Sequence, residues 1–295
     1  MNSIKQLLIL TTAILGVFFS GCIGPQPIDF QAPALDTAKP WTDCPFKNDP
    51  NDFQFAIVTD RTGGCRPGVF KKAMYQVNLL QPEFVMCVGD LIKGHTKDRD
   101  TVKHRFDEMD TILDSLEMRF FRVVGNNDIG NSVMADVYRE RYTLPYYHFV
   151  YKNALFLIVS TEDPPPKANI SDTQINYIKK VLQDTQSVRW TFIFMHRPLF
   201  VEQEGKLHEG WAKIENMLAG RGHTVFAGHW HTYAKHEKHG QNYIRLATTG
   251  GASNLSGIGA GEFDHIVWVT MTDQGPRIAN LLLDGIYDEN VNVAE

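Results

Sequence analysis

The feature that most constrains this sequence is a series of five apolar runs, each of which ends on a polar residue able to bind a ligand. From residue 52 onward such runs alternate with helical patterns, which is typical of βα units built around a buried sheet. Residues that follow the carboxyl ends of strands in an open α/β sheet meet in one crevice. We therefore expect the polar ends of the five runs to lie together. The runs are 53–59 before Asp60, 84–88 before Asp90, 120–124 before Asn126, 190–195 before His196, and 225–227 before His229 and His231.

These strand ends carry a mixed set of nitrogen and oxygen donors. Two carboxylates, one amide oxygen and three imidazoles are suited to Mn, Fe or Zn ions. A carboxylate shared by two ions holds them about 3.5 to 4 Å apart, a spacing at which a hydroxide and phosphate oxygens are stabilised together. Each residue also has an ordinary alternative, because a strand-end Asp often caps a helix or forms a turn and a lone His is often structural. The predicted metal ligands are Asp60, Asp90, Asn126, His196, His229 and His231.

The remainder of the main region adds helices and further strands without a repeat or a second linker. The helical pattern near 171–183 is the best marked, because Ser171 is placed to cap it and Gln174 stands three residues on. The glycines at 250, 251, 257, 259 and 261 suggest a mobile loop before the last strands. Helices are predicted at 68–80, 99–117, 132–141, 171–183 and 207–218, and further strands at 147–151, 154–160, 243–247, 263–270 and 277–283.

The composition fits a folded domain and argues against several other classes. A chain of 295 residues that is 43% hydrophobic can bury a large core. Gly 23, Pro 14 and 11% aromatic residues exclude collagen-like and wholly disordered chains. The formal charge is 29 − 34 = −5. Because neutralising phosphates requires clustered Lys and Arg, and the sequence has no basic run, we predict no nucleic-acid-binding patch.

The first 51 residues predict export. The apolar run at 7–19 is shorter than the about twenty residues that span a bilayer, and it fits the core of a signal peptide. The run leads into Phe19-Ser20-Gly21-Cys22, which resembles the lipobox of bacterial lipoproteins, where the Cys is lipidated. An ordinary secretory signal or a transmembrane anchor are the alternatives. We predict a lipoprotein signal peptide at 1–21, lipidation at Cys22, a Pro-rich tether at 22–51 and a single domain at 52–295.

These signals place the protein in the bacterial cell envelope, bound to a membrane through its lipid. Ile23 after Cys22 gives no Asp-type signal for retention at the inner membrane, which favours the outer membrane and leaves its face open. Export also permits disulfides. Cys87 lies in an apolar run and is predicted to be a buried thiol, whereas Cys44 and Cys65 either pair or stay free.

The ordered motifs resemble those of the calcineurin-like metallophosphoesterases, over residues 52–285. The resemblance implies a four-layer α/β/β/α sandwich with a dinuclear metal centre that hydrolyses phosphate esters. It implies that Asp60, Asp90 and His231 hold the first metal, and that Asp90, Asn126, His196 and His229 hold the second. The motifs are Asp60-Arg61-Thr62, Gly89-Asp90, Gly125-Asn126-Asn127-Asp128, Ile193-Phe194-Met195-His196 and Gly228-His229-Trp230-His231.

Two positions depart from the family pattern. Thr62 stands where the family usually has a His ligand, so the first metal loses an imidazole and we expect the second to bind more tightly. Asn127 stands where relatives carry a His that assists phosphate binding or protonates the leaving group, a role typically worth about 10²- to 10⁴-fold in rate. Asn127 is left to position the phosphate, with Asp128 beside it. Arg61 and, less directly, His95 are candidates to compensate.

The function that follows is hydrolysis of a phosphomonoester or a phosphodiester by a hydroxide held between two divalent ions. The substrate would be a phosphorylated small molecule or a phosphodiester. The alternative is a catalytically weakened relative that binds a phosphorylated or metal-bearing ligand at the cell surface. Asp90, Asn126, His196 and the two histidines of Gly228–His231 favour the enzyme, whereas Thr62 and Asn127 favour the binding protein. The sequence leaves the natural substrate, the metal identities and the oligomeric state open.

Overall fold

The structure is a computed structural model that describes residues 30–31, 41–42 and 44–286. The predicted signal peptide and Cys22 therefore lie outside the described residues, as does part of the tether. The chain divides into two compact units, Met1–Asp49 and Pro50–Glu295. In the first, the rings of Phe30 and Phe46 lie 5.0 Å apart. The described helices and strands all belong to the second unit. No helix in the described part of the chain is long and apolar enough to cross a membrane.

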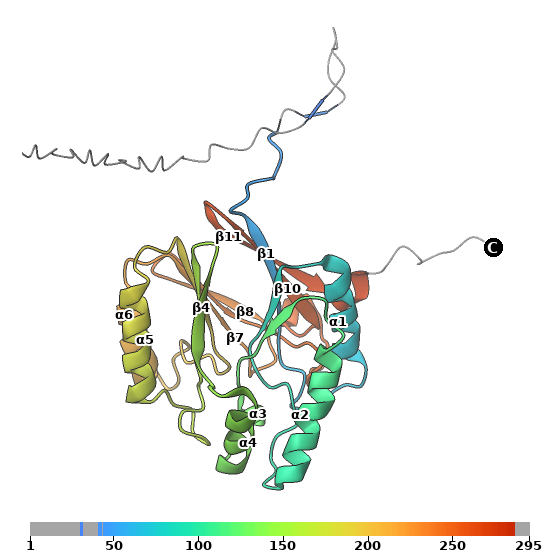
Figure 1. The fold of residues 1–295 in the computed structure, drawn as a ribbon, viewed down its shortest axis with the longest axis vertical. Coiled ribbons are helices and arrows are strands. Elements are labelled where there is room, and N and C mark those ends of the chain that lie inside the picture. Colours follow the sequence, from blue (N-terminus) through green and yellow to red (C-terminus); the bar gives the residue numbers. More distant parts are fainter. Residues whose placement is uncertain (1–29, 32–40, 43, 287–295) are drawn as a thin grey trace, which may run out of the picture. The chain divides into compact units, whose positions relative to one another are not determined.

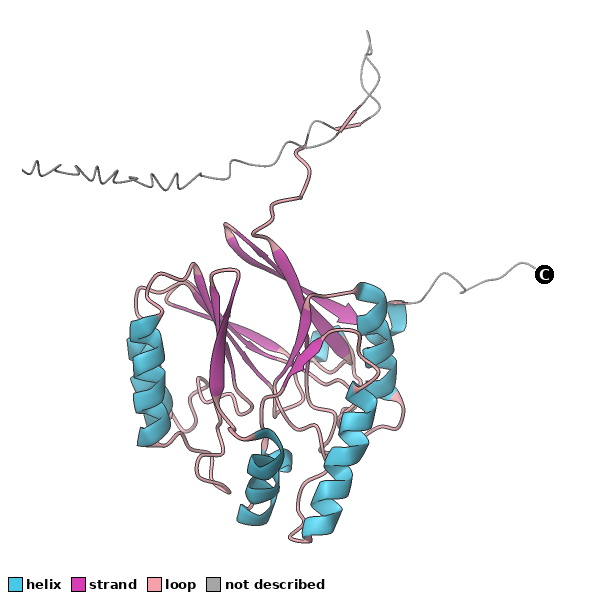
Figure 2. Ribbon diagram, viewed as in Figure 1, coloured by secondary structure: helices cyan, strands magenta, loops and turns pink. Residues whose placement is uncertain are grey.

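Two β-sheets form the centre of the second unit (Figures 1 and 2). The first has the order β11-β10-β1-β2-β3, with β1, β2 and β3 parallel, β10 antiparallel to β1, and β11 antiparallel to β10. The second has the order β4-β5-β6-β7-β9-β8, parallel from β5 to β9 with antiparallel edges. The strands are β1 (Phe53–Val58), β2 (Phe84–Cys87), β3 (Arg119–Phe121), β4 (Tyr147–Tyr151), β5 (Ala154–Ile158), β6 (Trp190–Phe194), β7 (His223–Ala227), β8 (Ala234–Lys238), β9 (Gln241–Arg245), β10 (His265–Thr272) and β11 (Gly275–Leu282).

Helices cover the outer faces of both sheets, which confirms the predicted mixed α/β sandwich. Figure 1 shows α5 and α6 beside the second sheet, and α1 and α2 beside the first. The helices are α1 (Val69–Leu80), α2 (Arg99–Leu113), α3 (Asn126–Ile129), α4 (Ser132–Tyr142), α5 (Asp172–Asp184) and α6 (Glu209–Met217), with short 3-10 turns η1 (Ile258–Ala260) and η2 (Leu283–Gly285).

The alternation of side chains along β5 shows how one strand serves two layers. Phe156 faces the other sheet, where its ring lies 5.2 Å from that of Phe55. Its neighbour Leu155 belongs to a separate cluster with Ile178 of α5 and Trp211 of α6. All five residues of β5 are buried, as expected for a strand that is covered on both faces. Each fully buried side chain of this size contributes about 1.5 to 3 kcal/mol.

Most predicted elements are present, and the differences have local causes. Gln174 N–H donates to Ser171 Oγ at 3.2 Å, so the predicted cap of α5 is confirmed. The helix predicted at 99–117 ends at Leu113, and Ser115 Oγ donates to the carbonyl of Ile112, a local bond that competes with a further helical turn. Sequence analysis missed β8, a charged edge strand whose side chains alternate between half-buried and exposed. It also missed α3, which holds three residues of the Gly125–Asp128 motif.

The segment Thr248–Gly251 was predicted to begin a mobile loop, and this is wrong. All four residues are buried. The N–H groups of Thr249 and Gly251 both donate to the carbonyl of Asp60, at 3.1 and 2.9 Å. Arg66 Nε donates to the carbonyl of Gly251 at 2.9 Å. The segment is therefore bonded to the loop that carries the first predicted ligand.

The three described cysteines are all free thiols, and they differ in burial. Cys87 is fully buried, as predicted, and accepts a hydrogen bond from Val123 N–H at 3.1 Å. Burial raises the pKa of its thiol to about 12, so it is an unreactive structural group. Cys44 and Cys65 are exposed free thiols.

Candidate metal centre

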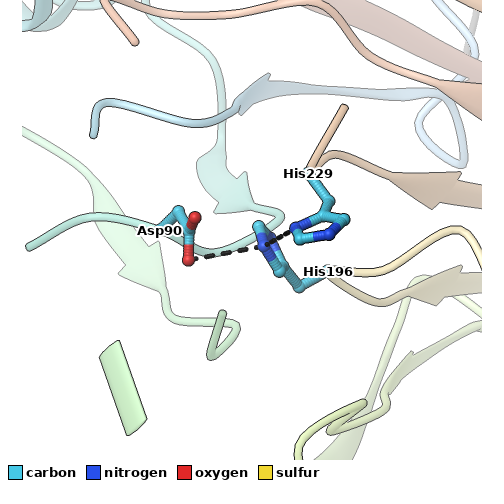
Figure 3. Close-up of side chains that lie close together, drawn as sticks. All are labelled: Asp90, His196 and His229. Carbon is cyan, nitrogen blue, oxygen red and sulfur yellow. Dashed lines mark hydrogen bonds and ion pairs between the residues drawn. The ribbon is translucent and has the colours of Figure 1, made fainter. Parts of the chain in front are cut away.

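The strand ends converge as the sequence predicts. Asp60 and Asp90 follow β1 and β2 of the first sheet, whereas His196 and His229 follow β6 and β7 of the second. Asn126 opens the short helix α3 after β3. Figure 3 shows Asp90, His196 and His229 facing one another, with the imidazole of His196 between the other two. Residues from both sheets thus form one site.

The four residues predicted for the second metal gather around one nitrogen atom. His196 Nε2 lies 3.0 Å from Asn126 Oδ1, 3.1 Å from His229 Nδ1 and 3.4 Å from Asp90 Oδ1. The other ring nitrogen, Nδ1, donates to the carbonyl of Val88 at 2.9 Å. This bond leaves Nε2 as the free donor atom, which is how proteins commonly orient a histidine ligand.

The residues predicted for the first metal are fewer and lie beside this group. His231 Nε2 is 3.3 Å from Asp60 Oδ1, and its Nδ1 donates to the carbonyl of Ala252 at 2.7 Å. The backbone N–H of His229 donates to Asp60 Oδ1 at 3.0 Å. Thr62 is buried in the same loop, where its N–H donates to the carbonyl of Asp90. The carbonyl of Asp90 thus joins its own loop to the loop of Asp60 and Thr62.

Two glycines of the motifs are required by close packing on the carboxylates. A Cβ atom on Gly228 would lie 2.2 Å from Asp60 Oδ2, and one on Gly125 would lie 2.2 Å from Asp90 Oδ1. Any larger residue would push a carboxylate out of place. The glycines before His229 and Asn126 therefore serve the site directly.

Asn127 and Asp128 hold the loop of Asp90. Both oxygens of Asp128 accept backbone N–H groups, those of Asp90, Leu91 and Ile92 among them, at 2.8 to 3.1 Å. Asn127 Nδ2 donates to Asp90 Oδ2 at 2.5 Å, and its Oδ1 accepts Gly94 N–H at 3.2 Å. Asn127 was expected to position the phosphate, but its amide is engaged within the protein. Both residues thus orient a ligand.

The two predicted compensating residues, Arg61 and His95, flank the loop of Asp90. Arg61 is half-buried and donates from Nη1 to the carbonyl of Leu91 at 2.8 Å, so one arm of its guanidinium braces the Asp90 loop. His95 is exposed, with a positive φ of 61°. Its neighbour Gly94 packs against Asn127, since a Cβ there would lie 2.6 Å from Asn127 Oδ1.

Sequence analysis missed Arg197, which lies next to His196 and reaches the same site. Its Nη1 is 3.0 Å from His229 Nε2, and its Nε donates to Glu162 Oε1. The Glu162 side chain is fully buried and that of Arg197 is 23% exposed. The sequence does contain a signal for Arg197: it directly follows a predicted ligand at a strand end, and residues at such an end share one crevice.

The charges of the site favour a bound cation. Burial opposes protonation of His196, but the carboxylates of Asp90 and Asp60 outweigh it and raise its pKa to about 9. Burial would raise the pKa of Asp90, but His196 and the Asn127 hydrogen bonds lower it to about 2. Burial, with the positive charges of His196 and Arg197, lowers the pKa of His229 to about 4. Burial and the charge of Asp90 raise the pKa of Asp128. The carboxylates thus stabilise positive charge, as a divalent ion requires.

The donor set fits a transition-metal ion. One ligand atom each from Asp90, His196 and His229 lie within 4.8 Å of one another. Two imidazoles, a carboxylate and the amide oxygen of Asn126 are borderline and hard donors that suit Mn, Fe or Zn. His196 also carries the hydrogen-bonded outer partner that metal-binding histidines usually have.

Comparisons with known proteins identify the family. The model of the calcineurin-like phosphoesterases matches residues 53–233, more than half of the chain. The chain therefore belongs to this family, whose members use metal ions to hydrolyse phosphate esters, and the resemblance of the motifs is confirmed. No curated protein matches the chain significantly.

Solved structures share the fold at low sequence identity. A dimetal phosphatase from Danio rerio is 15% identical, with a TM-score of 0.54 over 78% of this chain and 99% of that one. GAP50, the anchor in the inner membrane complex of Plasmodium, is 13% identical, with a TM-score of 0.60 over 80% and 86%. PhoD is 12% identical, with a TM-score of 0.56 over 78% and 68%. At these identities the likeness concerns the fold alone.

Proposed function

We propose that this protein hydrolyses phosphomonoesters or phosphodiesters at a centre of two divalent ions, Mn, Fe or Zn. The observation that carries the proposal is the meeting of Asp90, Asn126 and His229 within 3.4 Å of His196 Nε2. Ions held there would act as Lewis acids on the phosphate and lower the pKa of a bound water.

The residues of the chain have separate tasks in this proposal. Asp90 is the ligand common to both ions, and Asp128 and Asn127 fix its position through the loop and the carboxylate. His229 and His231 lie one residue apart and serve different ions. Asn127 cannot protonate a leaving group near neutral pH, so we expect aryl phosphates to be better substrates than alkyl phosphates.

The test is hydrolysis of an aryl phosphomonoester and of a bis-aryl phosphodiester with added Mn²⁺. The wild type is compared with Asp90→Asn and with Asp100→Asn, a matched change at an exposed residue of α2. We expect Asp90→Asn to lose at least about 100-fold in rate, because loss of even an outer-shell partner costs 10- to 100-fold. Asp100→Asn should behave as the wild type. If added Mn²⁺ does not raise the hydrolysis rate of the wild type above that of Asp90→Asn, the proposed hydrolysis is refuted.

The second candidate is a binding protein that has lost turnover. The observation in its favour is the pair Thr62 and Asn127, since Asn127 spends its amide on Asp90 and Gly94. Such a protein would bind inorganic phosphate in the presence of Mn²⁺, with loss of binding in Asp90→Asn, while the aryl phosphates remain intact. Calorimetry with phosphate, run beside the hydrolysis assay, separates the two functions.

We also propose that Cys22 carries a lipid that attaches the protein to a membrane of the bacterial envelope, the outer membrane being favoured. The support is the sequence pattern around Cys22, which lies outside the described residues. Mass spectrometry of the mature protein should show an N-terminus at a lipidated Cys22. Cys22→Ala should leave the membrane fraction. Retention of that variant in washed membranes would refute the lipid anchor.

A further inference from the structure

Arg197 is held at its base and presents its far end to the metal centre. Its backbone N–H donates to Thr161 Oγ1 at 3.1 Å, and its Nε donates to Glu162 Oε1. Its Nη1 lies 3.0 Å from Nε2 of His229, a predicted ligand. The side chain is 23% exposed, so part of it is open to solvent.

Glu162 is a buried carboxylate that serves this arginine. Its side chain is fully buried and its Oε1 accepts from Arg197. Its other oxygen, Oε2, has no hydrogen-bond partner within the described part of the chain. Burying a carboxylate with one unpaired oxygen lowers the stability of the folded protein, so Glu162 is not explained by a contribution to folding. Its effect here is to fix the direction of the guanidinium while leaving the Nη atoms to other acceptors.

The contact between Arg197 and His229 is incompatible with a metal on His229. A guanidinium has only N–H donors. The atom of His229 that faces His196 is Nδ1, so a His229 bound to metal through Nδ1 carries its hydrogen on Nε2. Two donors would then face each other across 3.0 Å. Nη1 must therefore find another acceptor, while Nε remains on Glu162.

Two other arginines near the site are bonded within the protein, Arg66 through its whole guanidinium and Arg61 through one arm. Arg66 pairs through both Nη atoms with the carboxylate of Asp264 at 2.7 and 2.6 Å. Arg61 donates from Nη1 to the carbonyl of Leu91. Arg197 has its terminal atoms at a ligand of the predicted second metal, where a phosphate oxygen bound to that ion would come within reach.

We propose that Arg197, anchored by Glu162, binds a non-bridging oxygen of the substrate phosphate and makes the site prefer phosphomonoester dianions over phosphodiester monoanions. This inference rests on the proposed function. A monoester offers one more anionic oxygen than a diester, and Arg–phosphate hydrogen bonds are charge-assisted. A fixed cation beside the metals therefore stabilises the dianion more than the monoanion.

The test measures phosphate binding and substrate preference together. Wild type, Arg197→Gln, Arg197→Lys and Glu162→Gln are loaded with Mn²⁺ and compared with Arg139→Gln, a matched change at an exposed arginine of α4. Calorimetry gives the Kd of inorganic phosphate and, separately, of Mn²⁺. Hydrolysis of an aryl monoester and a bis-aryl diester gives kcat/KM for each.

We expect Arg197→Gln to weaken phosphate binding by about 10- to 100-fold, the effect of losing a hydrogen bond between charged groups. The monoester kcat/KM should fall by a similar factor and that of the diester by much less. Mn²⁺ should bind at least as tightly as in the wild type. Arg197→Lys should recover part of the phosphate affinity, and Glu162→Gln should show a smaller loss with the same preference.

The result that overturns the inference is unchanged phosphate affinity in Arg197→Gln, or equal losses for the two esters. If the wild type hydrolyses neither ester, the proposed function fails, and the phosphate titration still decides on Arg197. In that case a loss of phosphate binding in Arg197→Gln, with Arg139→Gln unaffected, supports the anion-binding role, and no loss refutes it.

Discussion

The two halves of the candidate metal centre differ in their number of donor residues and in the hydrogen bonds that hold those residues. The half around His196 has four donors from four strand ends, and its members are held by hydrogen bonds to the Val88 carbonyl and the Asp128 carboxylate and by one from Asn127 Nδ2. The half around Asp60 has His231 as its only predicted imidazole, with Thr62 where the family usually has another. Asp90 is the ligand predicted to be shared by the two. Because affinity depends on the number and type of donors, the same crevice should hold one ion tightly and another weakly.

The first prediction separates the halves by removing one histidine from each. His196→Asn should weaken the tighter Mn²⁺ site by more than the about 100-fold that loss of an outer partner costs, since it removes the central ligand. His231→Asn should abolish the weaker site and leave the tighter one nearly unchanged. Isothermal titration of Mn²⁺ into the metal-free protein measures both.

The control for this pair is His104→Asn, a histidine of α2 whose side chain is 73% exposed. It should bind two ions as the wild type does. Thermal unfolding of the metal-free variants shows whether His196→Asn remains folded. Two equally tight ions in the wild type, or equal effects of the two site variants, would remove the distinction between the halves.

The same contrast explains what the sequence could and could not predict. The convergence of the six predicted ligand residues could be predicted because each follows a strand, and the topology of parallel strands brings their ends together whatever the detailed packing. The bracing was not predictable. Asp128 holds backbone N–H groups of residues 90 to 92, and Asn127 bonds Asp90 Oδ2 and Gly94 N–H. Arg197 is held by Glu162, 35 positions away. Such contacts depend on how the loops pack.

Element boundaries failed for related reasons. The charged strand β8 has no apolar alternation, and its position is set by pairing with β9 at the edge of a sheet. The segment Thr248–Gly251 has a composition typical of a loop, but its N–H groups find the carbonyl of Asp60. The partner of β8 is the next strand of the same hairpin, whereas the partner of Thr248–Gly251 lies about 190 positions away in sequence.

Acid should loosen the Asp60 half through His265, a buried histidine outside the centre. Its Nε2 accepts Ala247 N–H at 3.2 Å and its carbonyl accepts from Thr249 Oγ1, in the segment bonded to Asp60. Burial lowers its pKa from 6.5 to about 4. The unfolded chain therefore binds a proton between these values and the folded one does not. The contribution of His265 to the free energy of unfolding is therefore fully present above pH 6.5, and about 3 kcal/mol of it is lost as the pH drops to 4.

Urea unfolding of the metal-free protein at pH 7.5 and at pH 4 measures this term. The wild type should lose about 3 kcal/mol more than His265→Gln between the two values, because the variant has no group to protonate there. His104→Asn keeps His265 and should follow the wild type. If His265→Gln loses as much free energy of unfolding as the wild type between the two pH values, protonation of His265 is not the cause of the loss.

The bracing of Asp90 can be broken without touching a ligand. Asn127→Ala removes the hydrogen bond to Asp90 Oδ2 and the contact with Gly94, so we expect a 10- to 100-fold loss in Mn²⁺ affinity or in aryl phosphate kcat/KM. Asn131→Ala, which removes a hydrogen bond to the nearby carbonyl of Thr96, tests whether loosening of the same loop suffices. If Asn127→Ala and Asn131→Ala lower Mn²⁺ affinity and kcat/KM equally, the effect comes from loosening of the loop and not from the hydrogen bond to Asp90.

The weaker half can also be strengthened. Thr62→His supplies the imidazole that the family pattern has, and an added nitrogen donor should tighten the weaker Mn²⁺ site by about 10-fold while leaving the tighter one unchanged. Thr62 is 2% exposed, so the larger ring must be accommodated, and thermal unfolding is measured alongside the titration. Thr62→Gln, similar in bulk and lacking the imidazole, is the control. An increase with His and none with Gln shows that ligand type sets the difference between the halves. Equal changes in the two variants assign it to packing around the Asp60 loop instead.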